Sequence, residues 1–539
     1  MTRYSILLCF VLLSLTVGAQ RQTEYLNRGV VAVPKGGGVA LVSWRLLASD
    51  PENIAFNVYS VSSGGSPVRL NSTPVTEKTN LLVSLPNTSA QNIYVTAISG
   101  GTEGQPSLPW SIPAQAPAHR IVKEIDFRAI PGDPGGDAGF SMKFCWPADL
   151  DGDGEYDFVV DRQAYQTSAE EGDASDTHYL TPKVEAYRRD GTFLWRIDMG
   201  PNVKICSGHD DMVTAYDMDG DNHAEVLMKT SEGTVFADGT TILNPVSGTV
   251  TDYRTLTTVA PHYISVVNGM TGVEMARIEM PNKTWRDKAD LFGGNYNNHN
   301  GHFGIAYLDG IRPSLIFEYS NRNSDKSFNN FVTAWDFRNG QLTERFNWVN
   351  PGGIYNDFHQ IRIADVDGDG KDEMIEGGFV LDHDGTPLFG TDLVHGDRHR
   401  TTDIDPDRPG LETFAIQQNN PTTLGMALYD AATGEMLRRW YQSGVGDVGR
   451  GEAIEFHPDH RGLEMFSTMG GIYDAQGHQI TSGSAPFPYE GLWWDGDLLR
   501  EVIGSADGNG FNPVLSKIST TTYAYGRLVT LYNEKTPYY

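Results

Sequence analysis

Asp149-Leu150-Asp151-Gly152-Asp153-Gly154-Glu155-Tyr156-Asp157 is the stretch from which the fold is predicted. Its carboxylates fall at alternate positions, the glycines between them allow a tight curl, and Asp157 follows four residues after Asp153. In an extended loop this alternation gathers the carboxylates around one point. Hard divalent cations take about six to eight oxygen ligands, so the spacing suits Ca²⁺. The closing acid comes too early for an EF-hand, and no helical period flanks the loop.

The pattern recurs along the chain, which predicts a repeat architecture. Two good copies occupy 217–225 and 365–373, and two weaker ones occupy 403–412 and 455–464. We expect most of the bound Ca²⁺ ions to be structural, and leave open that one is catalytic. The predicted metal ligands are Asp149, Asp151, Asp153, Asp157, Asp217, Asp219, Asp221, Glu225, Asp365, Asp367, Asp369, Glu373, Asp403, Asp405, Asp407 and Glu412.

The composition limits the class of partner. The 539 residues carry a formal net charge of −28, and 39% of them are hydrophobic, as in an ordinary globular protein. Such an acidic chain argues against nucleic acid as a partner. A polyanionic substrate would have to meet a local basic patch or a bound cation.

The first 19 residues are predicted to be a secretory signal peptide. Arg3 supplies the positive charge, 6–17 the apolar core, and 17–19 a small-residue cleavage site. The apolar run is too short for a comfortable membrane span. We therefore expect a secreted or periplasmic protein without a membrane span, and a monomer. Spacing alone does not decide whether Cys145 and Cys206 form a disulfide.

Residues 20–115 are predicted to form a small β-sandwich of the fibronectin III type. Short β-branched and aromatic runs alternate with clusters of Gly, Ser, Pro and Asn. These runs lie at 39–44, 54–59, 81–85 and 93–98. The proline-rich residues 106–117 are predicted to be a linker.

From residue 118 to 539 the Asp loops alternate with hairpins that turn at Asp-Gly, Asn-Gly or related pairs. An Asp loop between two inner strands and an outer hairpin together make one four-stranded unit. The sequence therefore predicts an all-β fold, a seven- or eight-bladed β-propeller behind the sandwich. The hairpins lie at 185–195, 264–277, 333–340, 379–389, 427–434 and 471–477.

Candidate catalytic residues stand just ahead of the Asp loops. Equivalent positions in a repeat fold point to one face, so we expect these side chains to share it. For each histidine the alternative is a packing role beside a Ca²⁺ loop. Trp493 and Trp494 are expected in a blade core, with a stacking platform for sugar as the alternative. The candidates are His209, His359, His395, Arg398, His399 and Arg450, with Lys229 as a further basic residue.

The chain resembles the rhamnogalacturonan lyases of polysaccharide lyase family 11. The similar stretches include Arg28-Gly-Val-Val-Ala-Val-Pro34 and Leu194-Trp-Arg-Ile-Asp198, and they occur in order from about 22 to 515. The others are 43–47, 148–156, 228–230, 306–313, 364–373, 395–397, 405–412 and 493–501. The chain departs from the family pattern at 143–146, at 160–163 and after Pro513.

This resemblance implies an eight-bladed propeller with many structural Ca²⁺ ions. It also implies β-elimination at the rhamnose–galacturonate linkage of an acidic plant polysaccharide. That chemistry needs a base, which one of the candidate histidines or arginines would supply, and a cation to neutralise the uronate carboxylate, for which Arg398 or Arg450 is suited. Two alternatives stay open: a non-catalytic glycan-binding or adhesion propeller, and a glycoside hydrolase on the same scaffold.

Overall fold

The computed structural model describes most of the chain from residue 21 to residue 530. His209 and Cys206 lie outside the described residues, as does the predicted signal peptide. Cys145 carries a free thiol. The gaps are at 117, 119–124, 131–139, 143, 165–180, 204–212, 254–255, 257–259, 283–299, 323–327, 351–354, 357, 419–422, 445, 484–486, 495–498 and 506–512.

Two antiparallel sheets form the N-terminal part of the chain. One contains β1 (Val31–Gly36), β2 (Val39–Ser43) and β5 (Asn80–Ser84). The other contains β3 (Ala55–Ser62), β4 (Val68–Arg69), β6 (Gln91–Ser99), β7 (Thr102–Pro106) and β8 (Trp110–Ile112). Alternate side chains of the two sheets point into one apolar core, as the period of a strand requires. This core includes Ala40, Val42, Phe56, Val58, Val83, Ile93 and Val95.

The four strands predicted in this region correspond to β2, β3, β5 and β6. The predicted linker at 106–117 is wrong in part, because Trp110–Ile112 pair with β6 as strand β8. Proline clusters mark turns as readily as linkers, and here they flank a short edge strand.

In the described part of the chain, seven further antiparallel sheets follow, six of four strands and one of five. The first contains β9 (Phe140–Ser141), β10 (Cys145–Ala148), β11 (Asp157–Ala164), β12 (Lys183–Tyr187) and β13 (Phe193–Asp198). The second contains β14 (Val213–Tyr216), β15 (Glu225–Ser231), β16 (His262–Asn268) and β17 (Glu274–Glu279). The third contains β18 (Asn300–Ala306), β19 (Ser314–Arg322), β20 (Phe328–Arg338) and β21 (Gln341–Val349).

The remaining four sheets repeat this order. The fourth contains β22 (Arg362–Ala364), β23 (Glu373–Ile375), β24 (Phe379–Leu381) and β25 (Pro387–Gly390), and the fifth β26 (Gly396–Thr402), β27 (Glu412–Gln417), β28 (Leu424–Asp430) and β29 (Met436–Tyr441). The sixth contains β30 (Gly451–Ile454), β31 (Glu464–Ser467), β32 (Ile472–Tyr473) and β33 (Gln479–Thr481). The seventh contains β34 (Phe487–Leu492), β35 (Glu501–Ser505), β36 (Pro513–Ile518) and β37 (Tyr525–Thr530).

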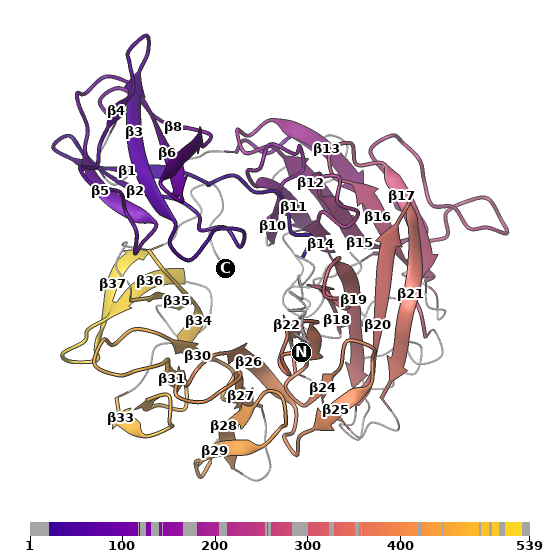
Figure 1. Cartoon of the computed structure of the whole chain (residues 1–539). Helices are drawn as coiled ribbons and strands as arrows, with labels where there is room; N and C mark the ends of the chain where they lie inside the picture. Colours follow the sequence, from indigo (N-terminus) through magenta and orange to yellow (C-terminus); the bar gives the residue numbers. More distant parts are fainter. Residues whose placement is uncertain are drawn as a thin grey trace, which may run out of the picture.

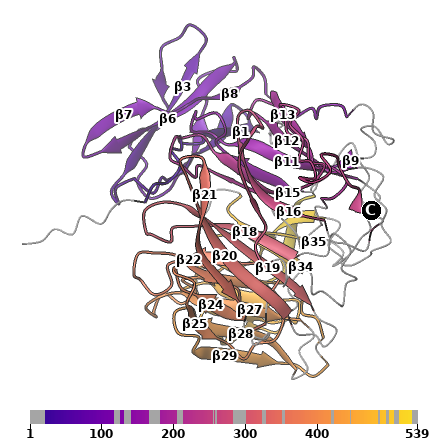
Figure 2. The same cartoon turned by 90° about the vertical axis from the view of Figure 1, so that its right-hand side faces the viewer.

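The seven sheets follow one another around a ring (Figure 1), and strands β1–β8 form a separate lobe at the upper left of both ribbon views (Figures 1 and 2). The first strand of each sheet contacts the first strand of the next, from β10 through β14, β18, β22, β26 and β30 to β34. No α-helix occurs among the described residues. The all-β prediction is confirmed, while the propeller and the sandwich type stay predictions.

Each Asp loop joins the first two strands of a sheet, and each predicted hairpin joins the last two. All six hairpins are antiparallel pairs, the first being β12 with β13 and the last β32 with β33. The Asp loops therefore lie at one end of the first strands, and the residues that enter these strands lie at the other end.

Residues 21–29 run as an arm across the loop ends of three sheets. Asn27 N–H donates to Gly154 O at 2.6 Å in the first Asp loop, and Tyr307 Oη donates to Gln22 O at 2.8 Å in the third sheet. Arg21 pairs with Asp372 at 2.9 Å in the fourth sheet. The arm thus connects the N-terminal lobe to several sheets at the end where the Asp loops lie.

The buried Glu155 links the lobe to the first sheet. It accepts the Gly29 N–H at 2.9 Å and pairs with Arg45 at 3.4 Å and Arg189 at 3.6 Å. Glu155→Ala leaves these donors without their acceptor, so we expect a loss of about 1–3 kcal/mol in the stability of the lobe, measured by urea unfolding. The exposed Glu52 provides the control, because Glu52→Ala should cost less than about 0.5 kcal/mol. Equal costs for the two variants would contradict this role of Glu155.

Candidate functional site

The first aspartate of each good Asp loop organises the loop backbone. Asp149 accepts the N–H groups of Gly152 at 2.8 Å and Gly154 at 2.7 Å. Asp217 and Asp365 make the same pair of bonds to the third and fifth residues after them. Gly152 and Gly154 have positive φ values of 76° and 84°, a conformation that glycine adopts without strain. The Asp-Gly alternation is therefore needed to curl the loop.

The last acid of each loop is buried and holds the loop to the second strand. Glu225 accepts the Met218 N–H at 2.8 Å, and Glu373 accepts the Val366 N–H at 2.8 Å. Glu412, Glu464 and Glu501 make the same bond in the later sheets. In the first loop Asp157 instead accepts the Arg189 N–H of the outer hairpin at 2.7 Å.

Three loops gather carboxylates closely enough to share one cation. In each group the ligand oxygens lie within 4.8 Å of one another. Asp157 Oδ2 and Glu373 Oε1 are buried and have no hydrogen-bond partner. Burial, together with repulsion from the neighbouring carboxylates, raises the pKa of Glu225 and of Glu373 to about 8. A bound cation relieves both penalties, so these residues fit Ca²⁺. The groups are Asp149/Asp151/Asp157, Asp217/Asp219/Glu225 and Asp365/Asp367/Glu373.

The other predicted ligands are placed differently. Asp153 and Asp221 lie in their loops but outside these groups, whereas Asp369 joins a separate group with Glu373 and His383. In the fourth loop, which contains Asp403, Asp405 and Asp407, the Arg408 side chain lies 3.3 Å from Glu412 and 3.0 Å from Asp430. In this loop the Arg408 guanidinium therefore neutralises the closing glutamate.

The candidate catalytic residues meet at the opposite end of the first strands. His359, His395 and Arg450 stand ahead of β22, β26 and β30, the first strands of three consecutive sheets. A parallel bridge between Phe358 and Gly396 brings the two histidines side by side. Gly396 is needed there, because a Cβ would lie 2.1 Å from the Phe358 ring.

The two imidazoles face each other. Their Nε2 atoms are 3.0 Å apart, and the rings are nearly perpendicular, with centroids separated by 4.5 Å. Asp397 Oδ1 lies 3.8 Å from His359 Nε2, and Asp397 Oδ2 lies 2.9 Å from the Arg450 guanidinium. Arg398 donates to His359 O at 3.5 Å. The structure brings His359, His395, Arg398 and Arg450 together, and with Asp397 we call them the rim cluster.

Asp397 was not predicted, although a signal for it was present. It follows His395 by two residues, the spacing that puts side chains on one face of a strand. The pairing of β26 with β27 shifts register at Asp397, and such bulges re-aim side chains next to functional sites. Burial raises the pKa of Asp397, and Arg450 partly offsets this. Two imidazoles and a carboxylate can serve as proton acceptors or as metal ligands.

A buried charge network lies next to the rim cluster. Burial, with Arg450 nearby, lowers the pKa of Arg398 to about 10, and burial next to Arg400 lowers that of Arg362 to about 10 as well. Arg400 forms an ion pair with Glu452, whose pKa burial raises to about 7. The first strands therefore concentrate positive charge beside the histidines, where an anionic substrate would need it.

Four further residues singled out in the sequence lie outside the rim cluster. His399 is fully buried, and burial with Arg362 nearby lowers its pKa to about 3, so it stays neutral. Lys229 is buried in β15 of the second sheet. The expectation that Trp493 and Trp494 lie in a core is wrong, because they are 61% and 53% exposed, with the Arg500 guanidinium 4.1 Å from the Trp493 ring.

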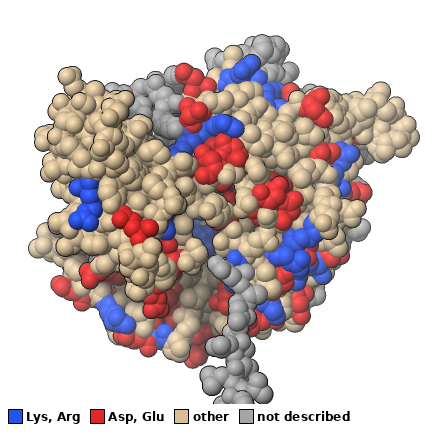
Figure 3. All heavy atoms as spheres, turned by 45° about the horizontal axis from the view of Figure 1, so that its top comes forward, with Lys and Arg blue, Asp and Glu red and all other residues tan. Residues whose placement is uncertain are grey.

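Acidic side chains are not confined to one place on the face drawn in Figure 3. On the face drawn in Figure 3, acidic side chains form several separate clusters, with basic side chains between them. Among the described residues, no helix has the length and apolar character needed to cross a membrane.

Comparison with known proteins gives matches over almost the whole chain. Residues 131–536 match the model of the rhamnogalacturonan lyase family 11 C-terminal domain, and residues 21–111 match that of the rhamnogalacturonan I lyase beta-sheet domain. Rhamnogalacturonan endolyase YesW of Bacillus subtilis is 37% identical over 499 residues, which are 90% of this chain and 76% of that protein. Rhamnogalacturonan exolyase YesX of the same species is 34% identical over 92% of this chain and 80% of its own length. The crystal structure of YesW superposes with a TM-score of 0.79 at 33% identity, covering 96% of this chain and 85% of that one.

The contrast between the second and fourth loops predicts how many ions each binds. Asp217→Asn removes a ligand from a compact carboxylate group, so we expect it to lower the Ca²⁺ content by about one ion per chain. Asp403→Asn should leave the content unchanged, because Arg408 already neutralises Glu412 in that loop. Elemental analysis of the dialysed variants measures this difference. Equal losses, or a loss only in Asp403→Asn, would contradict the assignment.

Proposed function

The chain belongs to rhamnogalacturonan lyase family 11, and from this premise we propose that it cleaves the rhamnose–galacturonate linkage of rhamnogalacturonan by β-elimination. Both curated relatives are named as rhamnogalacturonan lyases. The observation that carries the proposal for this chain is the rim cluster, where His359, His395 and Arg450 meet from three consecutive sheets.

The reaction sets three requirements. A base removes the proton on the carbon next to the uronate carboxylate, the bond from the neighbouring carbon to the glycosidic oxygen breaks, and a carbon–carbon double bond forms. The carboxylate must be neutralised while negative charge develops on it. The departing oxygen gains a proton from an acid. Water takes no part as a nucleophile, so no pair of carboxylates spaced for hydrolysis is needed.

We assign proton transfer to the His359–His395 pair. With the Nε2 atoms 3.0 Å apart, the two rings can share one proton, so one imidazole is left as an acceptor and the other as a donor. Asp397, 3.8 Å from His359, favours the protonated form of that ring once it has taken a proton. The pair could thus supply both the base and the acid of the elimination.

Arg450 is the proposed carboxylate clamp. Its side chain is 25% exposed and already binds one carboxylate, that of Asp397, at 2.9 Å. A guanidinium has further N–H donors in a fixed fork, so it can hold the uronate carboxylate as well. Arg398 is more deeply placed and supports the local positive charge. His399 and Lys229, both buried, are proposed as positioning residues.

The finer features of the fold and of the cofactor are part of the proposal. The seven sheets would be the blades of a β-propeller spanning 118–539, behind a sandwich at 20–115, in an exported, monomeric protein. Ca²⁺ would occupy the three compact Asp loops. Since β26 has seven residues, its loop end lies about 20 Å from its entry end at 3.3 Å per residue. The loop ions would therefore brace the sheets, while any catalytic ion would have to bind among His359, His395 and Asp397.

A direct assay distinguishes the proposed reaction from its alternatives. The purified protein, given rhamnogalacturonan I, should produce ultraviolet absorbance from the unsaturated uronate, and a Ca²⁺ chelator should abolish it because the Asp loops lose their ions. New reducing ends without absorbance would show hydrolysis instead. Binding without any cleavage by the folded, Ca²⁺-loaded protein would show a glycan-binding module. Either result would contradict the proposal.

Variants of the histidine pair test the assignment of the base. His359→Ala and His395→Ala should each lower kcat/KM about 10²–10⁴-fold, because positioned acid–base groups contribute that much. Added imidazole should restore part of the rate, which a purely structural defect would not allow. The control is His478→Ala, at an exposed hairpin residue paired with Asp474. Rates within about twofold of this control would rule out the pair.

A further inference from the structure

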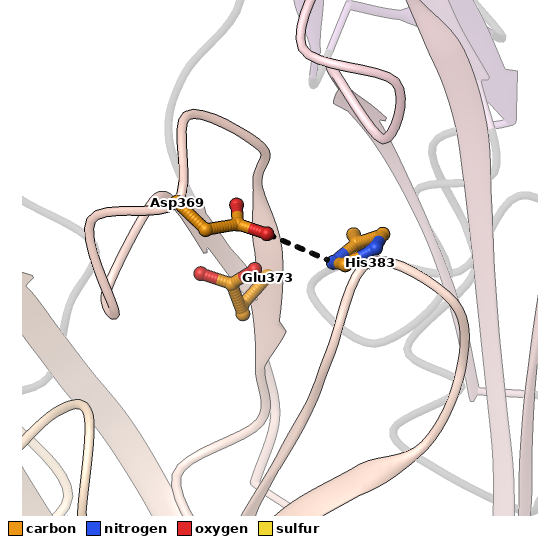
Figure 4. A group of neighbouring side chains, drawn as sticks. All are labelled: Asp369, Glu373 and His383. Carbon is orange, nitrogen blue, oxygen red and sulfur yellow. Dashed lines mark ion pairs between the residues drawn. The ribbon is translucent and has the colours of Figure 1, made fainter.

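The third Asp loop offers a second metal-binding group that the other loops lack in the described part of the chain. Asp369, Glu373 and His383 place ligand atoms within 4.8 Å of one another. Figure 4 shows Asp369 and Glu373 on the loop and the start of β23, with His383 facing them from the turn between β24 and β25. The group therefore spans the two connections of one sheet.

The buried members of this group have unmet polar atoms. Glu373 is fully buried, and its Oε1 atom has no hydrogen-bond partner. His383 Nδ1 lies 3.6 Å from Asp369 Oδ2 and 2.5 Å from Asp382 Oδ1, yet neither contact has hydrogen-bond geometry. A buried carboxylate oxygen without a hydrogen-bond partner is costly unless a cation lies against it.

An internal cation stands at the edge of this group. Lys371 Nζ lies 2.8 Å from His383 Nε2 and 3.2 Å from Asp369 Oδ2. It neutralises part of the local charge but does not reach the orphaned oxygen of Glu373, which has no partner. A metal ion would therefore compete with Lys371 for Asp369 and His383, but not for Glu373.

The first two loops show how this site differs from a Ca²⁺ loop. Their third aspartates, Asp153 and Asp221, belong to no metal-binding group among the described residues. His223 in the second loop lies 3.5 Å from Asp221, but both side chains are largely exposed and no buried acid joins them. Among the described residues, only the third loop places an imidazole and a buried acid in one metal-binding group.

We propose that Asp369, Glu373 and His383 bind a first-row transition ion such as Zn²⁺, next to the all-oxygen group of Asp365 and Asp367. Imidazole nitrogen together with carboxylate oxygen is a donor set that suits Zn²⁺, whereas Ca²⁺ takes oxygen ligands. Glu373 belongs to both groups, so it would be a ligand of both ions. The transition ion would fasten the β24–β25 hairpin to the Asp loop, a structural role independent of the lyase reaction.

The test is titration of the full-length, Ca²⁺-saturated protein with Zn²⁺, followed by calorimetry, and with Co²⁺, followed by its visible absorption. We expect about one ion per chain beyond the Ca²⁺ content. His383→Gln should weaken this binding about 100-fold or more while leaving the Ca²⁺ content unchanged. Lys371→Met should tighten it, because a competing cation is removed.

His223→Gln is the matched control, since it removes a histidine beside an Asp loop without touching the group. It should bind Zn²⁺ as the unchanged protein does. The proposal is overturned if His383→Gln and His223→Gln bind Zn²⁺ equally, if no ion binds beyond Ca²⁺, or if each Zn²⁺ displaces one Ca²⁺. Thermal melts of the Ca²⁺-loaded variants confirm that each is folded.

Discussion

The architecture depends on a buried glutamate that ends the connection between the first two strands of a sheet and accepts a backbone N–H from the start of the same connection. The bond recurs in five sheets, from Glu225 to Glu501. It fixes how the first strand turns back into the second, and so sets the spacing of the strands. Burying so many acids is unfavourable unless a positive charge neutralises them. In three loops the carboxylates are grouped so that a cation could do this, and in the fourth loop Arg408 pairs with Glu412.

The two ends of the first strands therefore carry different kinds of residue. The loop end of the first strand leads into acids that could share a cation, and the arm of residues 21–29 crosses the sheets at this end. At the entry end, the first strand carries His359, His395 and Arg450, where adjacent first strands converge. Because the strands are short and their ends rigidly held, the basic groups stay close together although each comes from a different sheet. Like charges there are tolerated because Asp397 and Glu452 pair with them.

Much of this could be predicted from the sequence, because the decisive signals are local. Alternating acids with glycines identify the loops, and Asp-Gly or Asn-Gly pairs identify the hairpins, all six of which form. The candidate catalytic residues occupy equivalent positions just ahead of the Asp loops, and this spacing predicted that they would lie on one face. What depends on side-chain reach could not be predicted: Arg408 turns back into its own loop, and Trp493 with Trp494 turns outward. Strand β8 could not be predicted, because prolines flank it and its partner β6 lies some distance away in the sequence.

We propose that the uronate binds at the rim cluster and not at the Asp loops. A crystal structure of the His395→Ala variant with a bound rhamnogalacturonan oligosaccharide tests this most directly. We expect a galacturonate carboxylate within hydrogen-bond distance of the Arg450 guanidinium, with the carbon that loses its proton facing His359. An oligosaccharide bound at the Asp loops, or one lying across the exposed tryptophans with its carboxylates away from Arg450, would contradict it.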